Sequence, residues 1–142
     1  MDPERVTVTS DTEWESSVGY SRAVRVGPHV HVSGTTATDE NGDVVGVGDP
    51  YAQAHRAFEI AVDALGEAGA DVDDVVRMRT FVTDVDDWEA IGEAHREFFG
   101  DVRPAATMVQ VERLIDPEHL VEVEVEAIAT ADDGPVDADP ST

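Results

Sequence analysis

Glutamates near the C-terminus and a histidine pair near the N-terminus are the residues whose spacing first suggests chemistry. Glu122, Glu124 and Glu126 alternate with apolar residues, so in a β-strand their carboxylates would share one face. His29 and His31 have the same spacing, and two strand histidines can bind a metal ion when a third ligand lies close to them. The sequence offers the pair no matching third ligand, and alternation in an acid-rich chain accounts for the glutamates. We therefore predict no metal site and no cofactor.

Strand patterns place these residues in a β-sheet. Alternation of apolar and polar residues predicts strands over residues 22–26, 29–35, 75–83, 105–114 and 120–130. A turn at Gly27-Pro28 separates the first two strands. Residues 5–9 also alternate, either as an edge strand or as a loose arm, and as a strand they would bring the sheet to six strands.

Two helices are predicted between the strands. Asp49 and Pro50 begin the first helix as N-cap and first helical residue, and apolar residues keep helical spacing to about residue 68. The second helix is predicted over residues 88–99, with Asp86 or Asp87 as its cap. Two helices can cover only one face of such a sheet. The fold class is therefore predicted as α+β: a single domain with a mixed six-stranded sheet and both helices on one face.

The strand patterns also predict which side chains meet the helices. The set expected to face them consists of Val30, Val32, Val76, Met78, Val82, Thr107, Val109, Val111, Val121, Val123, Val125 and Ala127. Trp88 is also expected to pack in the core. The opposite face mixes arginine with glutamate. It is either in contact with water or packed against identical subunits, where the ion pairs would be partly desolvated.

Composition narrows the function classes. The 142 residues carry a net charge of −23, all nine basic residues are arginine, and the absence of cysteine excludes disulfides and thiol catalysis. An acid excess without lysine is typical of proteins adapted to molar salt. Such a field opposes binding to nucleic acid and to anionic membranes. No apolar run is long enough to span a bilayer, so we expect a soluble, cytoplasmic protein.

The chain divides into three parts by composition. Residues 1–12 are polar and form the predicted arm or edge strand, and residues 13–130 hold the periodic segments of the folded domain. Residues 131–142 are acidic, contain proline and have little to bury, so we predict a disordered tail. The hydrophobic fraction of 41% argues against disorder in the rest of the chain.

Several short motifs resemble the Rid family, also named YjgF/YER057c/UK114 or RidA-like. Each is weak alone, but they occur in the family's order and spacing: Tyr20-Ser-Arg-Ala-Val, Val30-His-Val-Ser-Gly34, Ala52-Gln-Ala54, Phe81-Val-Thr-Asp84, Pro104-Ala105, Arg113-Leu114 and Glu124-Val-Glu-Ala127. The resemblance implies a chorismate-mutase-like fold and a homotrimer, with the mixed Arg–Glu face as the assembly face and three clefts between subunits. It also implies hydrolysis of small imines and enamines in those clefts.

The resemblance assigns roles to residues of the cleft. Glu124 would position and deprotonate a water molecule, and the hydroxyls of Ser33 and Tyr20 would orient the substrate beside the backbone of Gly34. These three side chains are the catalytic candidates. Met108 stands where the family often has cysteine or another small residue.

The chain departs from the family at the residue that would bind a substrate carboxylate. The family has an arginine directly after a Pro-Ala pair, because a bidentate arginine is the best carboxylate ligand, whereas this chain has Ala106. Gly92 and His95 stand where the family commonly has an asparagine and an aromatic residue, and His95 either lines the altered cleft or lies on the helix surface. We hypothesise that Arg79 or Arg103 supplies the missing positive charge. Alternatively, Arg79 pairs with glutamates of the neighbouring strands.

Three functions remain open. The first is a hydrolase acting on a small-molecule imine or enamine. The second is a trimer that binds a ligand or a protein without chemistry, which Ala106 and Gly92 favour. The third is the endoribonuclease or translation-inhibitor role attached to the family, which the charge balance disfavours because phosphate binding needs clustered basic residues.

Overall fold

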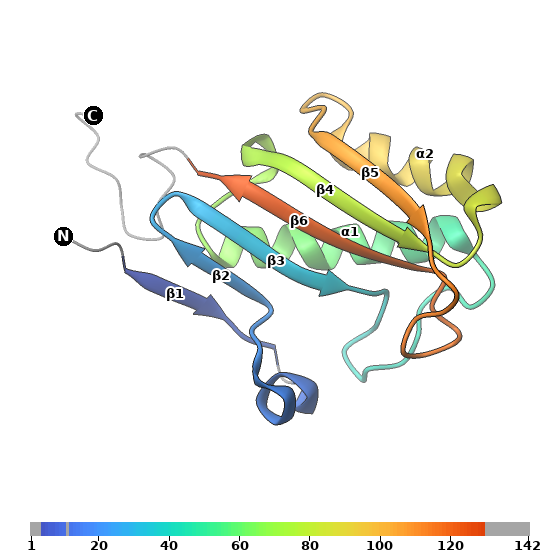
Figure 1. Cartoon of the computed structure of the whole chain (residues 1–142), viewed down its shortest axis with the longest axis horizontal. Helices are drawn as coiled ribbons and strands as arrows, with labels where there is room; N and C mark the ends of the chain where they lie inside the picture. Colours follow the sequence, from blue (N-terminus) through green and yellow to red (C-terminus); the bar gives the residue numbers. More distant parts are fainter. Residues whose placement is uncertain (1–3, 11, 130–142) are drawn as a thin grey trace.

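A single mixed β-sheet organises the fold (Figure 1). The computed structural model describes residues 4–10 and 12–129. The strands lie in the order β1-β2-β3-β6-β4-β5, and β4 and β5 pair in parallel whereas the other neighbours pair antiparallel. Their bounds are β1 Arg5–Val8, β2 Ala23–Val26, β3 His29–Thr35, β4 Val75–Val82, β5 Ala105–Gln110 and β6 Val121–Ile128. The predicted mixed six-stranded sheet is confirmed.

Two helices cover one face of this sheet and leave the other face open (Figure 1). They are α1 (Pro50–Glu67) and α2 (Trp88–Phe99). The Asp49 side chain accepts a hydrogen bond from the backbone N–H of Ala52 at 3.1 Å, as predicted for an N-cap. Gly69 follows α1 with φ 85°, a backbone conformation that favours glycine. Helix α2 connects the parallel pair β4 and β5, which needs such a crossover.

The core lies between the helices and the sheet. The largest fully buried apolar side chains are Phe58, Leu65, Ile91 and Phe99 of the helices and Val30, Met78, Val82, Val121, Val123 and Val125 of the strands. The predicted alternation along β6 is confirmed, since its valines are buried and its glutamates are not. Burying one such side chain stabilises the fold by about 1.5–3 kcal/mol, so this layer carries much of the stability.

Two irregularities in the pairing with β6 change which side chains face the helices. The register shifts between Val32 and Thr35 of β3 and between Val75 and Arg77 of β4. An extra residue on one strand reverses the alternation beyond it. As a result Val75 is buried and Val76, which was predicted to face the helices, is 44% exposed.

Strand β5 differs from the prediction in length and in phase. It ends at Gln110 rather than at residue 114. Thr80 of β4 pairs with Met108, so Met108 packs against the core while Val109 is exposed. The prediction that Thr107, Val109 and Val111 face the helices was wrong: Thr107 and Val109 of β5 are exposed, and Val111, which follows β5, lines a groove. A short edge strand takes its phase from its paired neighbour, which its own weak alternation does not reveal.

The start of α2 also differs from the prediction. Asp87 precedes the helix, but its side chain makes no capping hydrogen bond. Instead, a 3₁₀ turn (Val85–Asp87) leads into α2, and the Asp84 side chain accepts a bond from the N–H of Asp86 at 2.9 Å. Trp88, expected in the core, is 57% exposed, because the buried stripe of α2 begins one turn later, at Ile91.

The structure describes an edge strand and a short helix near the N-terminus. Residues 5–8 form β1, an edge strand that pairs with β2, and a short π-helix (Glu15–Gly19) follows it. The predicted tail, residues 131–142, lies outside the described residues. Within residues 4–10 and 12–129, no helix is long and apolar enough to cross a membrane.

Candidate functional site

A β-bulge near the end of β3 lies opposite Glu124. Because the β3–β6 register shifts between Val32 and Thr35, Ser33 and Gly34 together oppose the single residue Glu124. Bulges are frequent beside functional sites, since they redirect a side chain or end the pairing of a strand. The fold thus brings together Ser33, Gly34 and Glu124, three of the residues predicted for the site.

Hydrogen bonds fix the conformation of the bulge. Ser33 Oγ donates to the carbonyl of Ser21 at 2.6 Å, and Thr35 Oγ1 donates to the carbonyl of Ser33 at 2.7 Å. Arg22 Nη2 donates to the carbonyl of Gly34 at 3.0 Å. The hydroxyl proton of Ser33 is therefore committed, and only the lone pairs of its oxygen are left to accept a bond from a ligand.

A groove of about 360 Å³ opens beside the bulge. Its lining consists of Gly34, Phe81, Val111, Arg113, Leu114, Glu122 and Glu124. Phe81 pairs with Glu122 across β4 and β6, so the groove belongs to the face that the helices leave open. The lining combines apolar side chains with three charged ones, and its volume suits a small, polar metabolite.

Glu122 packs directly against the bulge. A Cβ atom at position 34 would lie 2.5 Å from Glu122 Oε2 and would clash with it, so this position of the carboxylate requires glycine. Burial raises the pKa of Glu122, and the charge of Glu124 raises it further, whereas Arg22 and His119 lower it. Glu122 therefore keeps its proton to a higher pH than an exposed glutamate and can donate it.

Arg79 of β4 forms ion pairs with Glu124 and Glu126 of the neighbouring strand β6. Arg79 Nη1 lies 3.0 Å from Glu126 Oε2 and 3.7 Å from Glu124 Oε1. The three side chains are about a third to two-fifths exposed, so each pair contributes about 1 kcal/mol or less. The guanidinium of Arg79 thus has glutamate partners on the open face of the sheet.

Ala106 and Met108 lie on the edge strand β5, on the other side of the sheet from Glu124. Ala106 pairs with Met78 and Met108 pairs with Thr80, and these partners point toward the helices. Within one protomer, the structure therefore does not bring Ala106 or Met108 together with the groove.

Three further predicted residues also lie elsewhere. Tyr20 is 41% exposed and directly follows the π-helix. His95 stacks edge-on against Phe58 with ring centroids 5.9 Å apart, and burial lowers its pKa. Arg103 has φ 56° in the segment between α2 and β5. The described lining of the groove includes none of the three, and Ser33 adjoins the groove only through its neighbour Gly34.

Comparison with known proteins identifies the fold. The family described as endoribonuclease L-PSP matches residues 11–131. This chain belongs to that family, the Rid (YjgF/L-PSP) family. A crystal structure of a YjgF/YER057c/UK114 family member from Mycobacterium tuberculosis is similar with a TM-score of 0.81 and 46% identity, covering 89% of this chain and 100% of that chain.

Two other Rid-family matches carry names that describe a ligand or an activity. The 3-aminoacrylate deaminase RutC of Acinetobacter baylyi is 38% identical over 104 residues, which cover 73% of this chain and 82% of the relative. A crystal structure of Escherichia coli TdcF with bound serine is 26% identical, with a TM-score of 0.74, and covers 87% of this chain and 94% of that chain. The match therefore extends over most of both partners in each comparison.

Sequence reasoning did not assign most of the groove lining of this Rid protein to the site: Phe81, Val111, Arg113, Leu114 and Glu122. Strand parity could have identified Glu122, since it lies two residues from Glu124 on the same face. Arg113 and Leu114 follow β5 in an irregular segment, where no periodic signal marks the direction of a side chain. Their place in the groove comes only from the path of the chain.

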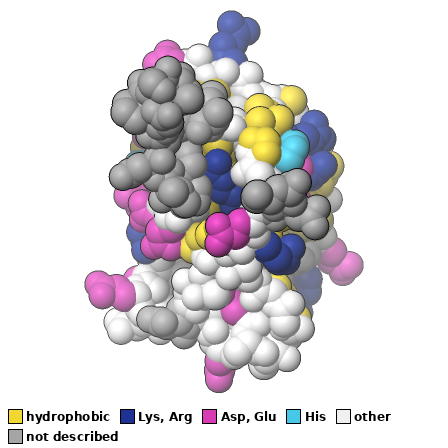
Figure 2. Space-filling model, turned by 90° about the vertical axis from the view of Figure 1, so that its left-hand side faces the viewer, with side chains coloured by type: hydrophobic (Ala, Val, Ile, Leu, Met, Phe, Trp, Pro, Cys, Tyr) yellow, Lys and Arg dark blue, Asp and Glu magenta, His cyan; other side chains and the backbone are white. Residues whose placement is uncertain are grey.

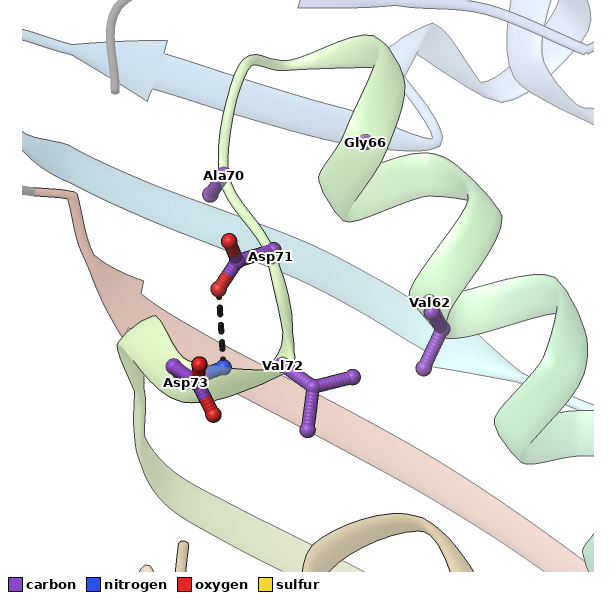
Figure 3. A pocket seen from close by; sticks show the side chains of 6 residues that line it. All are labelled: Val62, Gly66, Ala70, Asp71, Val72 and Asp73. Atoms are coloured by element: carbon purple, nitrogen blue, oxygen red, sulfur yellow. Dashed lines mark hydrogen bonds between the residues drawn. The ribbon is translucent and has the colours of Figure 1, made fainter. Parts of the chain in front are cut away.

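A second hollow of the Rid fold, of about 340 Å³, lies between α1 and a 3₁₀ turn (Val72–Asp74) (Figure 3). Val62 and Val72 form much of its wall, and Asp71 Oδ1 accepts a hydrogen bond from the N–H of Asp73 at 2.8 Å. The Asp71 carboxylate is thus committed to capping the turn. We regard this hollow as a feature of packing between two elements.

Metal and nucleic-acid sites were also considered for this Rid protein. Among the described residues, no group of three or more His, Asp or Glu side chains could hold a metal ion. His31 Nδ1 lies 3.4 Å from Glu126 Oε1, so the strand histidine has a carboxylate neighbour. Figure 2 shows acidic and arginine side chains interspersed at the end that carries the β2–β3 turn, with no continuous basic surface among the described residues in view. Phosphate backbones bind clustered basic residues, which this end does not offer.

Proposed function

We propose that this Rid protein hydrolyses small imines or enamines and that the reaction takes place in the groove beside the β3 bulge. The observation that carries the proposal is the meeting of Ser33, Gly34 and Glu124 across the β3–β6 pair. The similarity to a 3-aminoacrylate deaminase supports a substrate of the same class, a small enamine or imine acid.

In the proposed reaction, Glu124 takes a proton from a water molecule whose oxygen attacks the imine carbon. The C–O bond forms as the electron pair of the C=N bond moves to nitrogen, which takes up the proton from Glu124. The C–N bond then breaks as the new hydroxyl group gives its proton to the Glu124 carboxylate, so ammonia leaves and a carbonyl remains. Glu122, which retains its proton more strongly than an exposed glutamate, is placed in the same groove to protonate the leaving nitrogen.

The lone pairs of Ser33 define its part in the proposal. Since Ser33 Oγ already donates to Ser21, it would accept a hydrogen bond from an N–H of the substrate. An imine or enamine nitrogen carries such an N–H, whereas the product carbonyl does not. Ser33 would therefore favour the substrate over the product.

We also propose a homotrimer, in which the open face with its Arg–Glu pairs is the assembly face. Tyr20, Ala106 and Met108 lie outside the groove of their own protomer. The edge strand of a neighbouring copy would bring its own exposed Ala106 to the groove, whereas Met108 packs against the core of its own protomer. An acidic surface adapted to molar salt would keep such an assembly soluble.

Ala106 supports a second candidate, a trimer that binds a ligand without catalysis. A small apolar side chain at this position gives a substrate carboxylate no partner there. The groove would then serve recognition alone. The two candidates share a fold and a site and differ in turnover.

The decisive experiment measures hydrolysis of 2-iminobutanoate in molar KCl. The hydrolase proposal expects turnover by the wild type and a loss of about 10²- to 10⁴-fold in Glu124→Gln, which keeps the shape but not the base. Activity that appears only in Ala106→Arg would mean that the scaffold serves a different ligand. Inactivity of both would favour the binding protein.

The endoribonuclease role is the weakest candidate. A net charge of −23 opposes RNA, and screening in molar salt removes the repulsion without creating a basic surface. We expect no RNA binding at low or high salt, measured by the mobility of labelled RNA.

A further inference from the structure

Arg113 is a guanidinium held at the wall of the groove. Its Nε donates to the carbonyl of Leu114 at 3.2 Å and its Nη2 donates to the carbonyl of Ile115 at 3.0 Å. Both acceptors belong to the segment that follows β5, so the side chain is fixed to its own loop. The same residue lines the groove beside Glu122 and Glu124.

These two bonds leave most of the donors of Arg113 unused. A guanidinium has five N–H donors, of which two are committed here. Among the described residues, no carboxylate forms an ion pair with Arg113, whereas Arg56 pairs with Glu59 and Arg79 pairs with two glutamates. Other arginines, among them Arg77 and Arg96, also form no ion pair among the described residues, so Arg113 is distinguished by its place in the groove lining.

The other polar groups of the groove leave Arg113 available to an anion. Glu124 is paired with Arg79 of the neighbouring strand β4, so its carboxylate has a partner other than Arg113. The charged groups that act on Glu122 are Glu124, Arg22 and His119, and burial favours its neutral form. Arg113 is exposed, so a ligand can reach its remaining donors, and the ring of Phe81 lies in the same lining.

We propose that Arg113 binds the carboxylate of the substrate in this groove, in place of an arginine at position 106. The proposal rests on the proposed function, because it gives the imine or enamine substrate an acid group. The substrate is the small imine or enamine acid already proposed, and its carboxylate contacts Arg113 while the reacting carbon lies toward Glu124. A planar guanidinium suits a carboxylate because it can donate two parallel hydrogen bonds.

The test compares pyruvate with pyruvamide, which have nearly the same shape and differ in charge. Binding of each is measured by titration calorimetry in molar KCl with wild type, Arg113→Gln and Arg113→Lys. Arg5→Gln is the matched control, since it removes one positive charge from β1, at the opposite edge of the sheet. Circular dichroism and thermal unfolding check that each variant is folded.

We expect the wild type to prefer pyruvate over pyruvamide and Arg113→Gln to lose about 10- to 100-fold in affinity for pyruvate alone. Arg113→Lys should bind with intermediate affinity, because an ammonium keeps the charge but loses the paired donors. Arg5→Gln should match the wild type. Equal binding of the two ligands by the wild type, or an equal loss for both ligands in Arg113→Gln, would overturn the proposal.

Turnover distinguishes this inference from the proposed function. If the wild type hydrolyses 2-iminobutanoate and Arg113→Gln has an unchanged KM, then Arg113 is not the carboxylate ligand although the hydrolase proposal stands. If pyruvate binding depends on Arg113 while the wild type has no turnover, the carboxylate site stands and the hydrolase proposal fails.

Discussion

The two faces of the β-sheet surround their titratable side chains differently. On the helix side, His95 lies against the rings of Phe58 and Phe99, with centroids 5.9 and 5.3 Å away. On the open side, Glu122 lies in the groove with Glu124. Both residues are half-buried. Only Glu122 has other polar groups and an open volume beside it.

Burial moves both groups toward their neutral forms, lowering the pKa of His95 and raising that of Glu122. For His95 burial is the cause, whereas for Glu122 the charges of Glu124, Arg22 and His119 also act. A group coupled to charged neighbours can transfer a proton when a ligand changes that balance. A group among hydrocarbon rings responds mainly to changes in packing. For these two residues, the shifted pKa of Glu122 is compatible with proton transfer, whereas that of His95 reflects packing.

The largest expected effect is on stability and comes from truncating a ring on each face. Phe58→Ala removes a fully buried side chain and should lower the free energy of unfolding by about 3–5 kcal/mol. Phe81→Ala removes a half-buried ring from the groove wall and should cost less. Urea unfolding in molar KCl measures both. Equal losses would mean that the open face is packed as tightly as the core, and the contrast between the faces would fail.

The helix side was the more predictable of the two faces. Spacing of apolar residues located α1, and Asp49 marked its first turn, because both depend on local geometry. The alternation along β6 likewise identified its buried valines. Where the sheet departs from regular pairing, at Val76 and in β5, prediction failed, because bulges and neighbouring strands reset the phase.

The site was predictable only in part. Family motifs pointed to Ser33, Gly34 and Glu124, which the bulge brings together. Arg113 lies in a segment without regular structure, so its contact with the groove depends on the path of the chain between β5 and β6. Placing Ala106 near the groove requires a second copy of the chain, and a single sequence does not specify how copies pack.

Replacing Glu122 with glutamine tests the open face through pH. The pKa of Glu122 is raised above the ordinary 4.5, so the stability linked to its protonated form is fully present below 4.5 and is lost as pH rises through the folded-state pKa. Glutamine cannot ionise. The difference in Tm between Glu122→Gln and the wild type should therefore increase in favour of the variant as pH rises above 4.5. Glu89→Gln, at an exposed site on α2, is the control, and its Tm should change with pH in the same way as that of the wild type. The same pH dependence of Tm for Glu122→Gln and the wild type would contradict the raised pKa of Glu122.

His95→Phe should have the smallest effect on Tm. Its advantage over the wild type should grow as pH falls, whereas that of Glu122→Gln grows as pH rises. The pKa of His95 is lowered from 6.5, so its contribution to stability is present above 6.5 and is lost as pH falls and the unfolded chain takes up the proton first. Phenylalanine takes up no proton and can pack against Phe58 and Phe99. The Tm of the variant should gain on that of the wild type as pH falls below 6.5, while kcat/KM stays unchanged because His95 lies outside the groove lining. A drop in kcat/KM with a displaced pH profile would place His95 in an assembled cleft and would remove the distinction between the two faces.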